Sequence, residues 1–146
     1  MASATESLIP FHLRTAILES GRSHTYLAET ENLSVVIKCY AEGGENALHA
    51  HPNEDHVFVI LQGQATYLDG DEQTLVLDRN DGVLVPAGAL YRFESSGDEA
   101  LVLLRVGVGG RASSSERIGA DGVSIPPRST ANKYEPPVEV PGKFYE

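Results

Sequence analysis

Short apolar runs separated by turn residues are the feature that most limits the folds open to this chain. The runs are rich in β-branched and aliphatic residues, and glycine, proline, asparagine and aspartate between them supply the backbone angles of tight turns. They are Thr25–Ala28, Leu33–Tyr40, Ala47–His51, Val57–Leu61, Ala65–Leu68, Thr74–Leu77, Val83–Val85, Tyr91–Glu94 and Ala100–Val108. No helix of three turns is convincing in this region. The pattern predicts an all-β sandwich or barrel.

One of these runs differs from its neighbours in its pattern of apolar residues. Leu75 and Leu77 alternate with other positions, as on a strand with one buried face, whereas Val57–Leu61 is apolar at every position. Such a strand is typically covered on both faces. We therefore expect Val57–Leu61 to lie in the middle of the fold.

The chain divides into three parts by composition. Residues 1–23 form an amino-terminal arm or strand, in which Phe11–Glu19 fits either a further strand or a short helix. Residues 24–108 form the barrel. Residues 109–146 are rich in Gly, Ser and Pro and predict an extended tail. Tyr134, Val138 and Phe144 give this tail apolar anchors for its own barrel or a neighbouring subunit, while disorder is the alternative for its ends.

Composition excludes several classes of protein. A chain of 146 residues that is 41% hydrophobic fits a single domain with a buried core. Its net charge is −10 and the acidic excess lies before residue 107, so nucleic acid and anionic membranes are not expected partners. Cys39 is the single cysteine, which excludes an internal disulfide and a thiolate zinc site. No apolar segment approaches a membrane span, and we expect a cytoplasmic protein.

Three of the five histidines lie close together between Gly43 and Gly63. His49 and His51 are two residues apart, so on a strand both side chains leave the same face. A Pro-Asn-Glu-Asp turn then brings His56 back at the start of the next strand. One hairpin is therefore expected to carry three nitrogen ligands for a single metal ion.

The spacing of these residues resembles the cupin superfamily, in particular its small single-domain members. In the first cupin motif Gly43, His49, His51 and Gly63 match, and His56 stands where a glutamate is usual. In the second motif Pro86 and Gly88 match, Asn80 replaces a glycine, Tyr91 replaces a histidine and Ser95 replaces an asparagine. The resemblance covers roughly residues 33–106. It implies a double-stranded β-helix, a jelly-roll barrel that is usually dimeric and holds a metal in its mouth.

The two substituted ligand positions bear on the chemistry that the resemblance implies. Three neutral imidazoles from His49, His51 and His56 would leave a dication at +2, which favours an anionic ligand. Tyr91 as a direct ligand must lose a proton from a group of pKa near 10, at a cost of about 4 kcal/mol at pH 7. Tyr91 therefore fits two roles, a ligand to a strong Lewis acid or a hydrogen bonder and proton donor beside the metal.

Several other residues fit either a role in the site or a simpler structural role. Glu45 and Glu54 fit solvated turn charges or carboxylates that orient an imidazole, and Arg105 fits a clamp for a substrate carboxylate. Cys39 fits a small buried hydrophobic residue better than a nucleophile. Apolar side chains that either line a substrate pocket or belong to the core are Phe58, Ile60 and Phe93.

Two classes of function remain open from the sequence. The favoured one is a metal-dependent enzyme, an oxygenase, lyase or isomerase, that acts on a small anionic organic molecule with Fe, Ni, Mn or Zn. His49, His51 and His56 hold the ion, and Tyr91 binds it or moves a proton. The alternative is a cupin that binds a sugar or another small molecule without catalysis. A homodimer is expected in either case.

Overall fold

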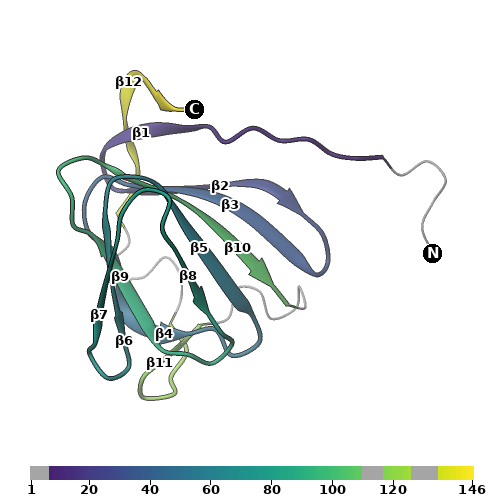
Figure 1. Cartoon of the computed structure of the whole chain (residues 1–146), viewed down its shortest axis with the longest axis vertical. Helices are drawn as coiled ribbons and strands as arrows, with labels where there is room; N and C mark the ends of the chain where they lie inside the picture. The colour runs from purple at the N-terminus through teal and green to yellow at the C-terminus, as the bar shows by residue number, and fades with distance from the viewer. Residues whose placement is uncertain (1–6, 110–116, 126–134) are drawn as a thin grey trace.

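The protein is built from β-strands and turns (Figure 1). The computed structural model describes residues 7–109, 117–125 and 135–146, without the side chains of residues 45 and 46. No helix occurs among these residues, so none is long and apolar enough to cross a membrane. The strands are β1 (Thr15–Ser20), β2 (Arg22–Glu29), β3 (Leu33–Tyr40), β4 (Gly44–Ala50), β5 (Asp55–Gln62), β6 (Ala65–Asp69), β7 (Thr74–Leu77), β8 (Gly82–Val85), β9 (Tyr91–Ser95), β10 (Leu101–Val108), β11 (Ile118–Gly119) and β12 (Val138–Tyr145).

Two five-stranded sheets face each other and form the barrel. Their strand orders are β2-β3-β10-β5-β8 and β11-β4-β9-β6-β7. Strands that are neighbours in a sheet pair antiparallel, and the chain crosses repeatedly between the two sheets. This is the all-β double-stranded β-helix that the sequence predicts.

Aromatic side chains fill the space between the sheets. Phe58 and Phe93 have no exposed surface, and Tyr40 and Tyr67 are almost fully buried. The ring of Phe93 stacks on Tyr67 with centroids 4.9 Å apart and meets the edge of Tyr40 at 5.1 Å. These rings come from four strands, so the core fixes the distance between the two sheets.

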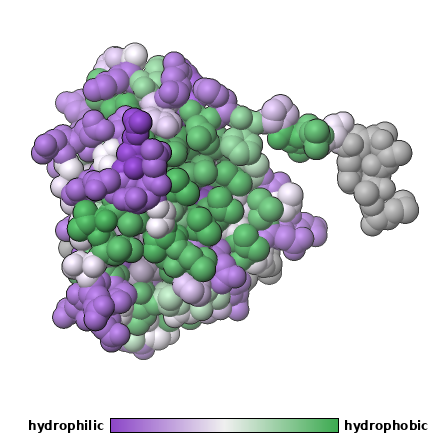
Figure 2. All heavy atoms as spheres, viewed as in Figure 1, coloured by the Kyte–Doolittle hydropathy of each residue, from purple (hydrophilic) through white to green (hydrophobic). Residues whose placement is uncertain are grey.

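The first sheet is apolar on its outer face as well (Figure 2). Phe58 and Ile60 of β5 point into the barrel with no exposed surface, and the alternate residues Val57 and Val59 point outward. Val57 is 40% exposed. The expectation that Val57–Leu61 is covered on both faces is therefore wrong for part of this strand within a single chain.

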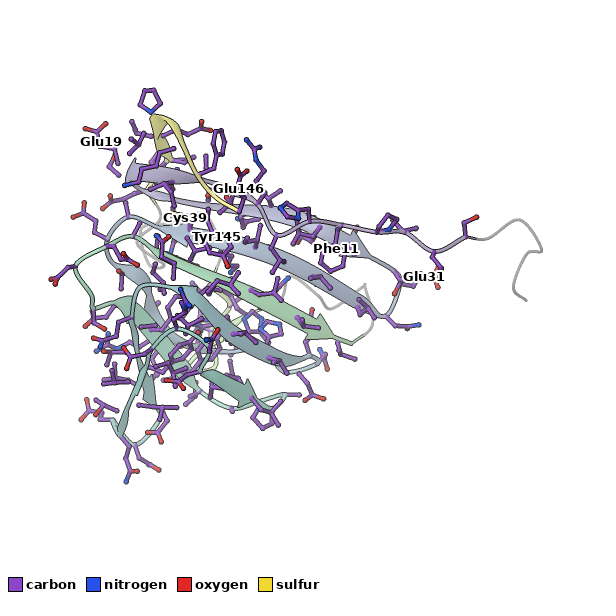
Figure 3. The ribbon with its side chains drawn as sticks, turned by 45° about the horizontal axis from the view of Figure 1, so that its top comes forward. Phe11, Glu19, Glu31, Cys39, Tyr145 and Glu146 are labelled. Atoms are coloured by element: carbon purple, nitrogen blue, oxygen red, sulfur yellow. The ribbon has the colours of Figure 1, made fainter. Side chains whose placement is uncertain are left out.

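Strands β1 and β12 pair with each other and cover another part of that outer face (Figure 3). Ile17 and Leu18 of β1 pack on Ile37, Cys39 and Val102. Residues of the tail, Val140 and Tyr145, join the same cluster from β12. Of the alternatives left open by the sequence, residues 15–20 form a strand, and the last part of the tail lies on its own barrel; Tyr134 falls outside the described residues.

Two turn residues have the positive φ angles that account for glycine at these positions of the cupin pattern. Gly63, between β5 and β6, has a φ of +80°, a conformation that glycine adopts without steric cost. Asn80, which replaces a glycine before β8, has a φ of +76°. Asparagine tolerates this left-handed region better than most residues, so the replacement keeps the turn.

We predict that β1 is part of the cooperative fold. Leu18→Ala removes a side chain that is only 4% exposed and should lower the free energy of unfolding by about 2–5 kcal/mol, measured by urea denaturation. Val76→Ala is the matched control, because Val76 is 52% exposed on β7 and its truncation should cost less than about 1 kcal/mol. Equal effects of the two substitutions would show that β1 does not pack on the barrel.

Candidate metal centre

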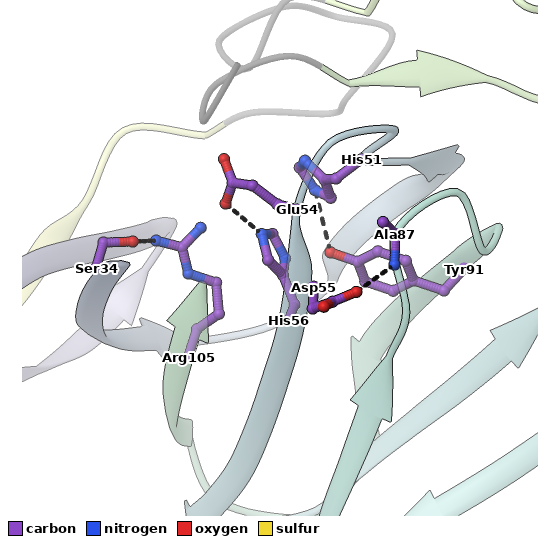
Figure 4. A network of polar contacts seen from close by, with 8 residues as sticks. All are labelled: Ser34, His51, Glu54, Asp55, His56, Ala87, Tyr91 and Arg105. Atoms are coloured by element: carbon purple, nitrogen blue, oxygen red, sulfur yellow. Dashed lines mark hydrogen bonds and ion pairs between the residues drawn. The ribbon is translucent and has the colours of Figure 1, made fainter. Parts of the chain in front are cut away.

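The three clustered histidines lie where the chain passes from one sheet to the other. His49 is on β4 of the second sheet, His51 follows β4, and His56 is on β5 of the first sheet. The turn between β4 and β5 is therefore an arch between sheets, and the expectation of a simple hairpin is wrong. The arch nevertheless places His56 beside His51. The centroids of the two imidazole rings are 4.3 Å apart (Figure 4).

All three imidazoles are buried side by side. His49, His51 and His56 are 0%, 6% and 1% exposed. The ring centroids of His49 and His51 are 5.1 Å apart. Alternation along the strand thus places His49 and His51 together as expected, and the arch adds the third ring.

Hydrogen bonds decide which ring nitrogen of two histidines can act as a ligand. Nδ1 of His49 donates to the carbonyl oxygen of Ala47 at 2.7 Å, and Nε2 of His56 donates to Oε1 of Glu54 at 2.9 Å. In a neutral imidazole the lone pair then lies on Nε2 of His49 and on Nδ1 of His56. An oxygen acceptor on one ring nitrogen is typical of histidines that bind metal through the other.

Tyr91 is a direct neighbour of this cluster. It is the residue opposite His49 in the β4–β9 pair, and it is 4% exposed. Its ring centroid is 4.5 Å from that of His49, and its hydroxyl lies 3.4 Å from Nε2 of His51. In the tautomer that carries its proton on Nδ1, the single lone pair of this Nε2 can serve the hydroxyl or a metal ion, not both at once.

Glu54 has a larger role than a solvated turn charge. It is 3% exposed and its Oε1 accepts the hydrogen bond from His56. The other oxygen, Oε2, is buried and has no hydrogen-bond partner among the described residues. Burial raises the pKa of the Glu54 carboxyl, and the nearby charge of Arg105 opposes that rise.

Two glycines, one on strand β10 and one just after it, make room for Glu54. A Cβ atom on Gly107 of β10 would lie 2.8 Å from Oε1 of Glu54 and 3.3 Å from Nε2 of His56. A Cβ on Gly109 would lie 2.8 Å from Cγ of Glu54. Gly107 and Gly109, at the end of the barrel, therefore pack against the candidate site.

The arch is tied to the loop that follows β8. The carbonyl of His51 accepts a hydrogen bond from the backbone nitrogen of Gly88 at 2.9 Å. Oδ1 of Asp55 accepts one from the backbone nitrogen of Ala87 at 2.8 Å. The two segments that carry the cupin motifs are therefore held together by hydrogen bonds at the mouth of the barrel.

The side chains as placed do not form a finished coordination shell. Among the described residues, no group of three or more His, Cys, Asp or Glu side chains is arranged to hold a metal ion. Nε2 of His56 is turned toward Glu54, and Nε2 of His51 faces Tyr91. The cluster thus has suitable donor atoms close together but not a common ligand point.

Among the remaining candidates, Arg105 lines the same pocket as Glu54, and the others whose side chains are described lie in the core. Arg105 donates from Nη2 to Oγ of Ser34 at 2.9 Å, and the Glu45 side chain falls outside the described part of the chain. Cys39 is buried, and burial raises the pKa of its thiol, as expected of a structural cysteine. Three apolar residues that fit either a pocket wall or the core have no exposed surface and line neither of the two described pockets: Phe58, Ile60 and Phe93.

A cavity of about 340 Å³ opens instead between the edge strands β7 and β8. Its walls are mostly apolar and include Val83, Val85 and Leu90, with the rings of Tyr67 and Tyr91 among them. Tyr91 is therefore shared between the cavity and the histidine cluster. Ala65 and Tyr67 alternate along β6, which indicates from the sequence that the Tyr67 side chain points inward. Alternation alone does not show whether such a side chain lines a pocket or belongs to the core.

Comparisons with known proteins agree with this architecture. Residues 36–107 match the family described as "Cupin domain". A curated relative, the uncharacterized protein YdbB of Bacillus subtilis, is 38% identical over 52 residues, which are 36% of this chain and 46% of that protein. The chain thus spans about half the length of this relative.

Several solved structures are similar to this chain in fold. A Klebsiella pneumoniae protein with a double-stranded β-helix domain has a TM-score of 0.57 at 24% identity, covering 64% of this chain and 82% of that one. A putative mannose-6-phosphate isomerase of Ralstonia eutropha has a TM-score of 0.56 at 21% identity, covering 61% and 85%. At such identities the likeness concerns the fold alone. Residues 36–107, with the two motifs that they contain and the barrel strands that they form, therefore belong to the cupin family.

Proposed function

We propose that the protein is a cytoplasmic metal-dependent enzyme that acts on a small anionic organic molecule. In this proposal His49, His51 and His56 bind one divalent transition metal ion, Fe, Ni, Mn or Zn. The ion supplies a Lewis acid or a redox centre when bound. The single observation that carries the proposal is the pair of hydrogen bonds that hold His49 and His56 by one ring nitrogen each.

The donor set supports a metal better than a purely structural role for these residues. Three buried imidazoles in contact add little hydrophobic stabilisation compared with aliphatic side chains of similar size, and each needs hydrogen-bond partners. Oε2 of Glu54, buried without a hydrogen-bond partner in the described structure, adds a further polar atom that a bound ion or its ligand could satisfy.

In this proposal Tyr91 moves a proton. Its hydroxyl lies beside His51, while its ring forms part of the wall of the 340 Å³ cavity. None of the three histidines is among the residues that line that cavity, so Tyr91 is the residue that links it to the histidine cluster. We therefore assign Tyr91 as the general acid or base, in preference to a direct ligand, whose deprotonation would cost about 4 kcal/mol at pH 7.

The charge of the site and the lining of the cavity support a small anionic substrate in this proposal. Three neutral imidazoles leave the charge of a dication uncompensated, which favours a carboxylate or enolate oxygen on the substrate. The cavity walls around Tyr67 and Tyr91 are mostly apolar, and the volume falls in the range of small-molecule sites. A small molecule with an apolar body and one acidic end fits both features.

Metal content tests the proposal directly. Protein dialysed against Zn(II) or Mn(II) should contain close to one ion per chain by elemental analysis. His49→Ala should lower this content at least tenfold, because it removes a donor held in place by Ala47. His24→Ala is the control, since His24 is exposed on β2 and should retain the ion. A wild-type protein that takes up no metal would contradict the proposal and leave a non-catalytic binding module.

Replacing Tyr91 separates its two possible roles. Tyr91→Phe keeps the aromatic packing and removes only the hydroxyl, so metal affinity should stay within about threefold of wild type while any turnover is lost. The free energy of unfolding should change by no more than about 1.5 kcal/mol. Loss of the metal from this variant would identify Tyr91 as a ligand and contradict the assignment.

A substitution that displaces the Glu54 side chain tests whether Glu54 positions His56 for metal binding. The added methyl group of Gly107→Ala would displace the Glu54 carboxylate and release His56, so metal affinity should fall about 10–100-fold in a competition titration. Gly70→Ala is the matched control, because a Cβ there meets Leu90 at an ordinary 3.4 Å. Equal affinities for the two variants would show that Glu54 does not position His56.

A further inference from the structure

The short strand β11 borders the candidate metal centre. It pairs antiparallel with β4, so that Ile118 lies opposite Ala50 and Gly119 lies opposite His49 (Figure 1). Residues that lie opposite each other in an antiparallel pair project from the same face of the sheet. The face of β11 that contains Gly119 is therefore the face from which the imidazole of His49 projects. Strand β11 lies outside residues 36–107, so the match to the cupin family does not extend to it.

Arg117 directly precedes β11 and lies on that same face. Its carbonyl oxygen accepts a hydrogen bond from the backbone nitrogen of Ile125 at 3.0 Å, which continues the strand back to residue 117. Alternation along a strand then places Arg117 on the same face as Gly119. Continued by one residue, the register of β4 and β11 sets Arg117 against His51. The basic side chain thus belongs to the face that carries the histidines.

The guanidinium of Arg117 has buried donors without a partner. Its Nε and Nη1 atoms are buried and make no hydrogen bond among the described residues. A guanidinium binds a carboxylate through Nε with Nη2 or through Nη1 with Nη2, so each of these forks keeps an unused donor. The chain holds 21 Asp and Glu against 11 Lys and Arg, yet no described carboxylate accepts from these two atoms. Because a buried charge without a counter-charge is costly, this arrangement indicates an anion from outside the chain.

Arg105, the clamp for a substrate carboxylate that the sequence suggests, is in a different state. Its Nη2 donates to Oγ of Ser34 at 2.9 Å, and its charge interacts with the Glu54 carboxyl. Nε of Arg105 is buried without a hydrogen-bond partner in the described structure as well, but Glu54 lines the same pocket and compensates its charge. A carboxylate that approached Arg105 would also be repelled by Glu54. Arg117 is therefore the better anion-binding group.

We infer that Arg117 binds the acidic end of the substrate. The inference rests on the proposed function, in which the histidines hold the metal and the substrate is a small anion. The strand order β11-β4-β9 puts His49 between Arg117 on one side and Tyr91 on the other. A carboxylate held by Arg117 leaves the rest of the molecule on the side of the histidines and the Tyr91 hydroxyl. Two strand spacings are about 10 Å, so the substrate class is an acid of about that length, such as an aryl carboxylate.

Carboxylate binding by the full chain tests the inference. The probes are benzoate, phenylacetate and cinnamate, each compared with its uncharged amide by isothermal titration calorimetry of the metal-free protein. Wild type should bind at least one acid about tenfold or more tightly than its amide. Arg117→Met should lose this preference, and Arg117→Lys, which keeps the charge without the fork, should keep part of it. Arg79→Met is the matched control, because Arg79 is exposed on the turn before β8 and should retain the preference.

Thermal unfolding of the ligand-free variants separates binding from a structural role. Arg117→Met removes a buried charge and keeps an apolar side chain of similar length, so its melting temperature should equal or exceed that of wild type. An arginine that stabilises the fold would give the opposite result. A lower melting temperature for Arg117→Met with an unchanged preference for the acids overturns the inference.

The results for Arg117 and for the metal are independent of each other. Absence of binding for all three acids, or equal binding of an acid and its amide, overturns the inference. The same holds for acids that bind only to Zn(II)-loaded protein and bind Arg117→Met as tightly as wild type, although that result supports the proposed function. A preference that depends on Arg117 in a protein that takes up no Zn(II) supports the anion site and contradicts the metal-dependent enzyme.

Discussion

The arch between β4 and β5 is the constraint on which the candidate site depends. Over a few residues the chain leaves the second sheet and enters the first, and hydrogen bonds from Gly88 to His51 and from Ala87 to Asp55 hold it against the loop after β8. This crossing fixes the position of His56 relative to His51, with their ring centroids 4.3 Å apart. With it, residues from two sheets meet at one mouth of the barrel, as three imidazoles, a carboxylate and a phenol.

A buried polar cluster of this kind is stable only if its polar atoms form hydrogen bonds with one another or with the backbone. Glu54 accepts from His56, the Ala47 carbonyl accepts from His49, and the Tyr91 hydroxyl lies near His51. Gly107 and Gly109 leave the space that the Glu54 side chain occupies. The aromatic core beneath, built on Phe58 and Phe93, keeps the sheets at a fixed separation and so holds the polar groups in contact.

Much of the fold could be predicted from the sequence, because alternation and turn residues are local signals. Leu33–Tyr40 and Thr74–Leu77 are strands with the predicted ends. The tail strand β12 was not predicted, since its pairing with β1 depends on a contact between the two ends of the chain. The same limit applies to the site. The spacing of His49 and His51 indicated a shared face, but the burial of Glu54 and the cavity beside Tyr91 arise from β10 and β7, which sequence spacing cannot place.

The central claim is that His49, His51 and His56 act together as one metal-binding unit. The most direct measurement is NMR of the histidine ring nitrogens during titration with Zn(II). The account predicts that the resonances of these three rings shift together and saturate at one ion per chain, while those of the exposed His12 and His24 stay unchanged. Zn(II) shifts confined to His12 and His24, or three rings that respond at different concentrations, would contradict it.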